Sequence, residues 1–117
     1  MVNLMMTPDL FNIYWIDLSP TKGHEQNFKR PGLVIANHPT GLATIIPLTT
    51  TLGAKSFPYT QKIQKNSTNL LSDDSVALIF QMRSVDFRER NRGRLGKIEG
   101  VELELIKTQI KLYLNLS

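Results

Sequence analysis

GLVIANHPTGLATIIPL, residues 32–48, is the stretch that decides the fold. It contains two apolar runs, 32–37 and 42–48, and both carry the β-branched residues that are typical of strands. The segment NHPTG between them has the residue types that turns require. Proline cannot donate a hydrogen bond to a neighbouring strand, so Pro47 predicts an edge or a bulge in the second run. The stretch therefore predicts two consecutive strands joined by a loop.

Other strand-like runs lie on both sides of this stretch. FNIYWIDL, residues 11–18, is aromatic and β-branched and ends at Ser19-Pro20, so it predicts a strand. QKIQKN, residues 61–66, alternates weakly. SVALIFQM, residues 75–82, is a continuous apolar run and predicts a strand buried on both faces, which RSVDF, residues 83–87, extends or follows. Consecutive strands joined by loops predict an antiparallel sheet.

The pattern changes to helical spacing from Glu102 onward. The apolar residues at this spacing are Leu103, Ile106, Ile110, Tyr113 and Leu114. They predict a C-terminal amphipathic helix. Strands followed by one helix predict an α+β fold with a small, curled antiparallel sheet, partly closed into a barrel because closure protects strand edges. A chain of 117 residues has room for one core, so we expect one domain over residues 1–117.

Composition excludes several classes of protein. The chain is 41% hydrophobic and 21% charged, as in ordinary globular proteins. No apolar run approaches the roughly 18 residues of a membrane span, and the start lacks a signal-peptide pattern, so we expect a cytoplasmic protein without a membrane partner. There is no cysteine, which excludes disulfides and thiolate chemistry. With only His24 and His38 as imidazole ligands, the sequence predicts neither a metal centre nor another cofactor.

The net charge of +4 is concentrated in one segment. Residues 83–97 hold six cationic and two acidic side chains, a balance of +4, so the rest of the chain is neutral. Clustered arginines are typical of a surface that binds a polyanion, because guanidinium groups grip phosphates at two points. A solvated hairpin or an anchor for an acidic partner protein would have the same composition.

Two residues at predicted strand ends are candidates for binding phosphate. Arg30 precedes Pro31, which favours extended backbone at the point where the chain enters the second strand. A cation held there could stabilise the transition state of phosphoryl chemistry. Thr49 follows an apolar run, so its hydroxyl would stand at the rim of the sheet. Taken singly, the arginine also fits a solvated or salt-bridged role, and the threonine a turn cap.

The polar loop between the first two strands adds further candidates. Glu25 and Gln26 could read base edges or simply order the loop. His24 has a reference pKa of roughly 6.5 and could act as a general base, although no second histidine completes an acid–base pair.

Taken together, these segments resemble a known family. GHEQNFKRP after the first strand, PLTT at the end of the third, and SVALIFQMRSVDFRER before an amphipathic helix are similar to the MazF/PemK/Kid family of toxin endoribonucleases. The resemblance runs from Asn12 to Leu116. It implies the SH3-like barrel that PemK shares with CcdB, and the role of an mRNA interferase in a type II toxin–antitoxin system.

The resemblance also assigns roles to residues. Arg30 matches the catalytic arginine of the family, Thr49 its hydroxyl partner, and Glu25 an active-site position in the mobile loop. The positions that it implies for substrate binding are Gln26, Thr50, Gln81 and Arg83.

The implied reaction is cleavage of single-stranded RNA without a metal, at specific sequences, to give 2′,3′-cyclic phosphate and 5′-OH ends. Such cleavage of mRNA inhibits translation and growth. The implied partners are a second copy of the chain and an acidic antitoxin, with DNA bound only indirectly through the antitoxin complex. The proton carriers stay open: an arginine is a poor base at neutral pH, which leaves Glu25 or His24.

Two departures from the family pattern keep other functions open. Phe11 and Asn12 stand where the family has Gly-Asp, which removes a turn glycine and a carboxylate, and His24 replaces a small residue. One alternative is a gyrase poison on the same fold, which would not need an arginine and a hydroxyl directed at phosphate. The other is an RNA-binding module that has lost its activity.

Overall fold

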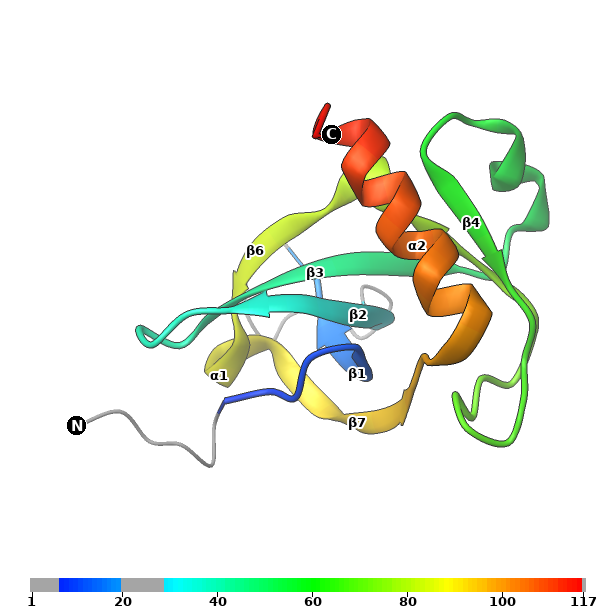
Figure 1. Cartoon of the computed structure of the whole chain (residues 1–117). Helices are drawn as coiled ribbons and strands as arrows, with labels where there is room; N and C mark the ends of the chain where they lie inside the picture. The colour runs from blue at the N-terminus through cyan, green and yellow to red at the C-terminus, as the bar shows by residue number, and fades with distance from the viewer. Residues whose placement is uncertain (1–6, 20–28, 117) are drawn as a thin grey trace.

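The computed structural model describes residues 7–19 and 29–116, which form a curled sheet with a helix across it (Figure 1). The elements, in which η denotes a short 3-10 helix, are β1 (Asn12–Asp17), β2 (Lys29–Asn37), β3 (Leu42–Thr49), η3 (Leu52–Ser56), β4 (Thr60–Ile63), β5 (Ser75–Leu78), η4 (Ile79–Gln81), β6 (Arg83–Asp86), α1 (Phe87–Arg90), β7 (Asn91–Lys97) and α2 (Gly100–Tyr113).

The strands form one antiparallel sheet in the order β4-β5-β3-β2-β1-β7, and β6 also pairs with β3. Strand β3 is therefore an interior strand. On the side away from β2, it pairs with β6 through Leu42–Ile45 and with β5 through Leu48 and Thr49. Pro47 falls in the gap between these two pairings. Pro47 was expected at an edge or a bulge rather than in a fully paired centre. Strand β3 is not an edge strand, but Pro47 is paired only on one side, opposite Gly32 of β2, so it does not lie in a fully paired position.

The predicted α+β class with an antiparallel sheet and a C-terminal helix is confirmed. The sheet is not closed, because β4 and β7 at its two ends do not pair with each other in the part of the chain that the structure describes. Helix α2 crosses one face (Figure 1). Within residues 7–19 and 29–116, no helix is long and apolar enough to cross a bilayer.

The loop between β2 and β3 forms as its residues predict. The backbone N–H of His38 donates to the Leu42 carbonyl at 2.8 Å, and the N–H of Gly41 donates to the His38 carbonyl at 3.0 Å. Gly41 has φ 97°, a conformation that other residues rarely adopt, so this glycine is required by the turn.

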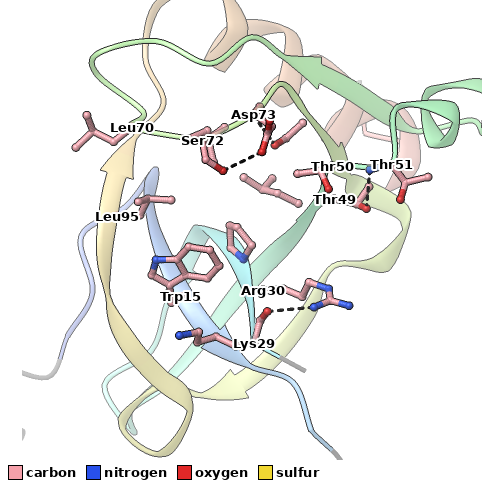
Figure 2. Close-up of a pocket in the computed structure, with 14 residues that line it drawn as sticks. Trp15, Lys29, Arg30, Thr49, Thr50, Thr51, Leu70, Ser72, Asp73 and Leu95 are labelled. Carbon is pink, nitrogen blue, oxygen red and sulfur yellow. Dashed lines mark hydrogen bonds between the residues drawn. The ribbon is translucent and has the colours of Figure 1, made fainter. Parts of the chain in front are cut away.

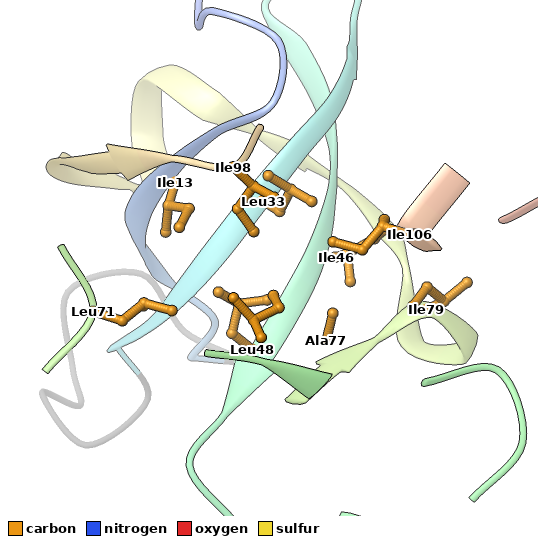
Figure 3. Close-up of a cluster of buried hydrophobic side chains, with 10 residues drawn as sticks. Ile13, Leu33, Ile46, Leu48, Leu71, Ala77, Ile79, Ile98 and Ile106 are labelled. Atoms are coloured by element: carbon orange, nitrogen blue, oxygen red, sulfur yellow. The ribbon is translucent and has the colours of Figure 1, made fainter. Parts of the chain in front are cut away.

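Buried side chains form two clusters. The larger contains Ile13, Leu33, Ile46, Leu48, Ile63, Leu71, Ala77, Ile79, Ile98 and Ile106 (Figure 3). Ile106 comes from α2 and is fully buried, so this cluster joins the helix to the sheet. The smaller contains Tyr14, Ile16, Val34, Ala43, Ile45, Val85 and Phe87. Every one of β1, β2 and β3 contributes to both, as the alternation of side chains along a strand requires.

Two features differ from the sequence-based expectation. The run 75–82 is not one strand: β5 ends at Leu78, and the chain turns through η4 before β6 begins. No helix or strand was predicted within the basic segment after residue 87, but the segment forms α1 and β7. The Asp86 carboxylate caps α1 by accepting a hydrogen bond from the Glu89 N–H, and β7 pairs with β1.

Candidate functional site

Arg30 and Thr49 lie at adjoining ends of neighbouring strands. In the β2–β3 ladder, Gly32 is opposite Pro47. Continuing this antiparallel register by two residues brings Arg30 opposite Thr49, near the start of β2 and at the end of β3. Both residues line the same two cavities. The pairing of two central strands therefore brings the two residues to the same cavities.

The first cavity, called here the main cavity, has a volume of about 440 Å³. Figure 2 shows Thr49, Thr50 and Thr51 on one side of it together with the Arg30 guanidinium, and Trp15 and Leu95 on the other. The residues that complete its lining are Lys29, Pro31, Leu48, Leu70, Leu71, Ser72, Asp73 and Ser75.

The second cavity, called here the side pocket, adjoins the same pair of residues. It has a volume of about 200 Å³, and Arg30, Thr49 and Gln81 contribute its polar side chains. Leu18 and Pro47 are among its apolar lining residues. Arg30 and Thr49 thus contribute to the lining of both hollows.

The hydroxyl of Thr49 is oriented by its own loop. Its oxygen accepts a hydrogen bond from the Thr51 N–H at 3.2 Å. No acceptor for the Thr49 hydroxyl proton lies among the described residues, so the group can donate to a ligand. Arg30 is exposed, and its Nη1 donates to the Lys29 carbonyl at 3.2 Å. A guanidinium beside a hydroxyl donor is suited to bind a phosphate group.

The other residues predicted for the site are placed differently. Thr50 lines the main cavity, and Gln81 lines the side pocket. Arg83 opens β6 with its side chain exposed and lines neither cavity. Glu25 and Gln26 lie outside the described residues, as does His24.

The basic segment has a structural role in addition to its charge. Arg92 donates to the Asp17 carboxylate at 3.1 Å, and Arg90 lies 4.0 Å from the same carboxylate. Arg90 also donates to the Ser19 carbonyl at 2.6 Å. Arg94 donates from Nε to the Asn12 side chain at 2.6 Å. These arginines tie β7 and the turn before it to β1.

The departure at Phe11 and Asn12 falls where the backbone has a conformation that favours glycine. Phe11 has φ 63°, the left-handed conformation that a glycine adopts readily. Its N–H donates to the Val34 carbonyl at 2.6 Å, and its carbonyl accepts from the Ile98 N–H at 2.9 Å. The amide oxygen of Asn12 accepts the bond from Arg94, so an uncharged acceptor stands in for a carboxylate.

Sequence reasoning missed one wall of the main cavity. Trp15 and Lys29 form part of it, and the Lys29 Nζ lies 5.3 Å from the Trp15 ring centroid. Ser72 and Asp73 form another part. These residues come from distant segments and share no motif. The one available signal was strand pairing, which places Lys29 beside Asp17 and hence near Trp15.

Solved structures define the class of this fold. The chain resembles MazF from Deinococcus radiodurans with a TM-score of 0.74 and 28% identity, over 94% of this chain and 98% of that one. It also resembles a mycobacterial endoribonuclease solved in complex with its cognate antitoxin, with a TM-score of 0.71 and 19% identity, over 94% and 97% of the two chains.

Sequence comparison then gives the family. The sequence model of the PemK-like, MazF-like toxins of type II toxin–antitoxin systems matches residues 10–114. The endoribonuclease toxin MazF of Escherichia coli K12 is 33% identical over 109 residues, which cover 90% of this chain and 92% of that protein. The chain belongs to the PemK-like, MazF-like toxin family.

Proposed function

We propose that this protein is a toxin endoribonuclease that cleaves single-stranded RNA, mRNA in particular, at specific sequences and without a metal ion. The observation that carries the proposal is the convergence of Arg30 and Thr49 on shared cavities. Its E. coli relative is named as an endoribonuclease toxin. Cleavage of mRNA would stop translation and growth.

The proposed chemistry is an internal transfer at phosphorus. The ribose 2′-OH loses its proton and its oxygen forms a bond to the adjacent phosphorus. The bond from phosphorus to the 5′ oxygen breaks, and that oxygen takes a proton, which leaves a 2′,3′-cyclic phosphate and a 5′-OH end. Arg30 stabilises the extra negative charge, and Thr49 donates to a non-bridging oxygen. Glu25 is the proposed general base.

The remaining proposed contacts are with the rest of the RNA. Thr50 and Gln81 line the two hollows on either side of the reacting phosphate, and Gln26 and Arg83 extend the contact along the strand. Hollows of this kind can receive bases only if the bases are unstacked, which favours a single strand over a duplex.

The proposed partners follow from the family. The chain, as one toxin domain over residues 1–117, forms a homodimer in the cytoplasm, with no membrane partner. An acidic antitoxin binds it, as the solved mycobacterial relative is bound by its cognate antitoxin. The net charge of +4 is complementary to such a partner. DNA is bound only indirectly, through the antitoxin.

Cleavage of a long unstructured RNA in EDTA tests the proposal. We expect discrete cuts by the wild type, 5′-OH ends at each cut, and a loss of at least about 100-fold in rate for Arg30→Ala. Lys111→Ala, an exposed change on α2, is the charge-matched control and should cleave like the wild type. Intact RNA in the presence of folded wild-type protein would overturn the proposal.

A further inference from the structure

We propose that the main cavity is a base-specific subsite, which holds one nucleobase next to the reacting phosphate and selects guanine through the Asp73 carboxylate. This inference rests on the proposed function for its RNA substrate. It assigns a ligand class to four residues of the cavity lining that have no role in the proposed cleavage step: Trp15, Lys29, Ser72 and Asp73.

The charges around the main cavity are separated. Lys29 and Arg30 lie at one rim, and Ser72 and Asp73 lie at the opposite rim (Figure 2). A nucleotide has the matching polarity, with an anionic phosphate at one end and a base edge with N–H donors at the other. A nucleotide bound with its phosphate toward Arg30 therefore points its base toward Asp73. The volume of about 440 Å³ is in the range of small-ligand sites.

The wall between the two rims is aromatic. Trp15 is half-buried, with its indole ring lining the cavity (Figure 2). The Lys29 ammonium lies 5.3 Å from the ring centroid, where it restrains the ring and adds positive charge near the expected phosphate. Unstacked RNA bases commonly bind against such aromatic side chains. Trp15 thus provides affinity for any base, and selection must come from the polar rim.

Asp73 provides the selection because an ionised carboxylate only accepts hydrogen bonds. The Ser72 hydroxyl donates to Asp73 Oδ2 at 3.0 Å and orients the carboxylate. Guanine presents two adjacent donors, N1–H and the N2 amino group, which match the two oxygens of a carboxylate. Adenine and cytosine present one amino group beside an acceptor nitrogen. Uracil has a carbonyl oxygen on each side of its N3–H, and both would face the negative charge. The expected order is guanine first and uracil last.

The chain has a single tryptophan, so its fluorescence reports on this cavity alone. We would titrate the wild type with guanosine and uridine monophosphates, neither of which is cleaved. We expect quenching by both, with half-saturation at a concentration about tenfold lower or more for the guanine nucleotide. Equal half-saturation, or no quenching by either, would overturn the inference.

Two matched variants identify the group responsible. Asp73→Asn changes an exposed carboxylate to an amide and should abolish the preference for guanine while leaving the fold intact. Asp74→Asn makes the same change at the next residue, which does not line the main cavity. The Asp74 side chain accepts a hydrogen bond from the Lys65 N–H at 2.9 Å, and the amide oxygen of asparagine can still accept this bond. That control should keep the preference. A preference that survives in Asp73→Asn would exclude Asp73 as the selecting group.

Cut-site mapping separates this inference from the proposed function. Cleavage at sites with no guanine at a fixed position beside the cut would overturn the subsite and leave the ribonuclease intact. Absence of cleavage, together with guanine-selective quenching that requires Asp73, would overturn the ribonuclease and leave the subsite intact.

Discussion

The guanidinium of Arg92 donates to the buried carboxylate of Asp17 at 3.1 Å and so joins the outer strand β7 to the end of β1. The same carboxylate accepts a hydrogen bond from the Ser19 N–H at 2.9 Å. Because β1 pairs with β2 through Asp17 opposite Lys29 and Ile16 opposite Arg30, this ion pair also supports the strand that carries the site.

Removal of the Asp17 carboxylate should destabilise the fold strongly. Asp17→Ala leaves Arg90 and Arg92 without their carboxylate, and we expect the free energy of unfolding to fall by about 3 kcal/mol in urea titrations. Glu104→Gln, which breaks the exposed pair of Glu104 with Lys107, should cost less than about 0.5 kcal/mol. Equal costs for the two variants would show that the Asp17 pair contributes nothing beyond surface charge.

A second stability prediction concerns Gly96 in β7. A Cβ atom at this position would meet the Asn69 carbonyl and lie 2.8 Å from the Thr68 carbonyl oxygen, and backbone cannot yield as a flexible side chain can. We expect Gly96→Ala to cost about 3 kcal/mol. Gly53→Ala adds the same methyl group where nothing lies within 4 Å. Thermal melts should show that its free energy of unfolding stays within about 0.5 kcal/mol of the wild-type value. If Gly96→Ala were as stable as the wild type, the loop before β5 would have to move away from the added methyl group at little cost.

Phe11 tests the left-handed backbone at the start of β1. Both Phe11→Gly and Phe11→Ala remove the ring that packs against the larger core cluster, so the difference between them isolates the backbone. At φ 63°, glycine should be more stable than alanine by about 1 kcal/mol. At Leu105, an exposed position within α2, the order should be reversed by a similar amount. Alanine equal to glycine at position 11 would mean that the backbone relaxes out of this conformation.

The sequence predicted the parts of the fold whose signal is local. The runs 11–18, 32–37 and 42–48 became β1, β2 and β3, because continuous apolar residues fit strands that are covered on both faces. Strand β7 was missed because it is largely exposed and carries charges and glycines, and its pairing with β1 depends on backbone bonds and on Asp17. The break after Leu78 was missed because a continuous apolar run does not show where the chain turns. The turn after Leu78 lets β5 pair with one section of β3 and β6 with another.

The candidate site likewise has residues that a local sequence pattern identifies and residues that only the fold brings together. Arg30 and Thr49 could be named because each stands at the end of a recognisable strand within a family pattern. Trp15, Ser72 and Asp73 could not, because only the three-dimensional arrangement brings segments so far apart in the sequence to one cavity.

The basic segment should divide into arginines that hold the fold and arginines that bind RNA. The side chain of Arg83 is exposed on β6 and makes no hydrogen bond or ion pair with another described residue, so Arg83→Gln should leave the melting temperature unchanged. If Arg83 contacts one phosphate, the slope of log K against log salt for single-stranded RNA should decrease by about 0.7. Arg92→Gln should instead lower the melting temperature, because it removes a partner of Asp17. An unchanged salt slope in Arg83→Gln would remove that residue from the RNA interface.

Thr49 provides the sharpest test of the proposed transition state, because its hydroxyl can be removed without changing its shape. We expect Thr49→Val to lower kcat and kcat/KM equally, by about 100-fold, since the lost donor acts on a non-bridging oxygen only as charge develops there. Thr49→Ser should restore most of the rate. The loss of the bond from the Thr51 N–H costs about 1 kcal/mol of stability, so melting curves should be measured beside the kinetics.

The shape of the pH–rate profile distinguishes this hydroxyl from a proton carrier. A threonine does not titrate in the accessible range, so Thr49→Val should lower the profile uniformly, whereas Glu25→Gln should remove its acidic limb if that carboxylate is the base. Thr44→Val is the matched control, since this β3 hydroxyl bonds to Ser84 and lines neither cavity. A different outcome, in which Thr49→Val raises KM and leaves kcat unchanged, would mean that the hydroxyl stabilises the bound substrate and the transition state equally. Thr49 would then be a substrate-binding residue and not a catalytic one.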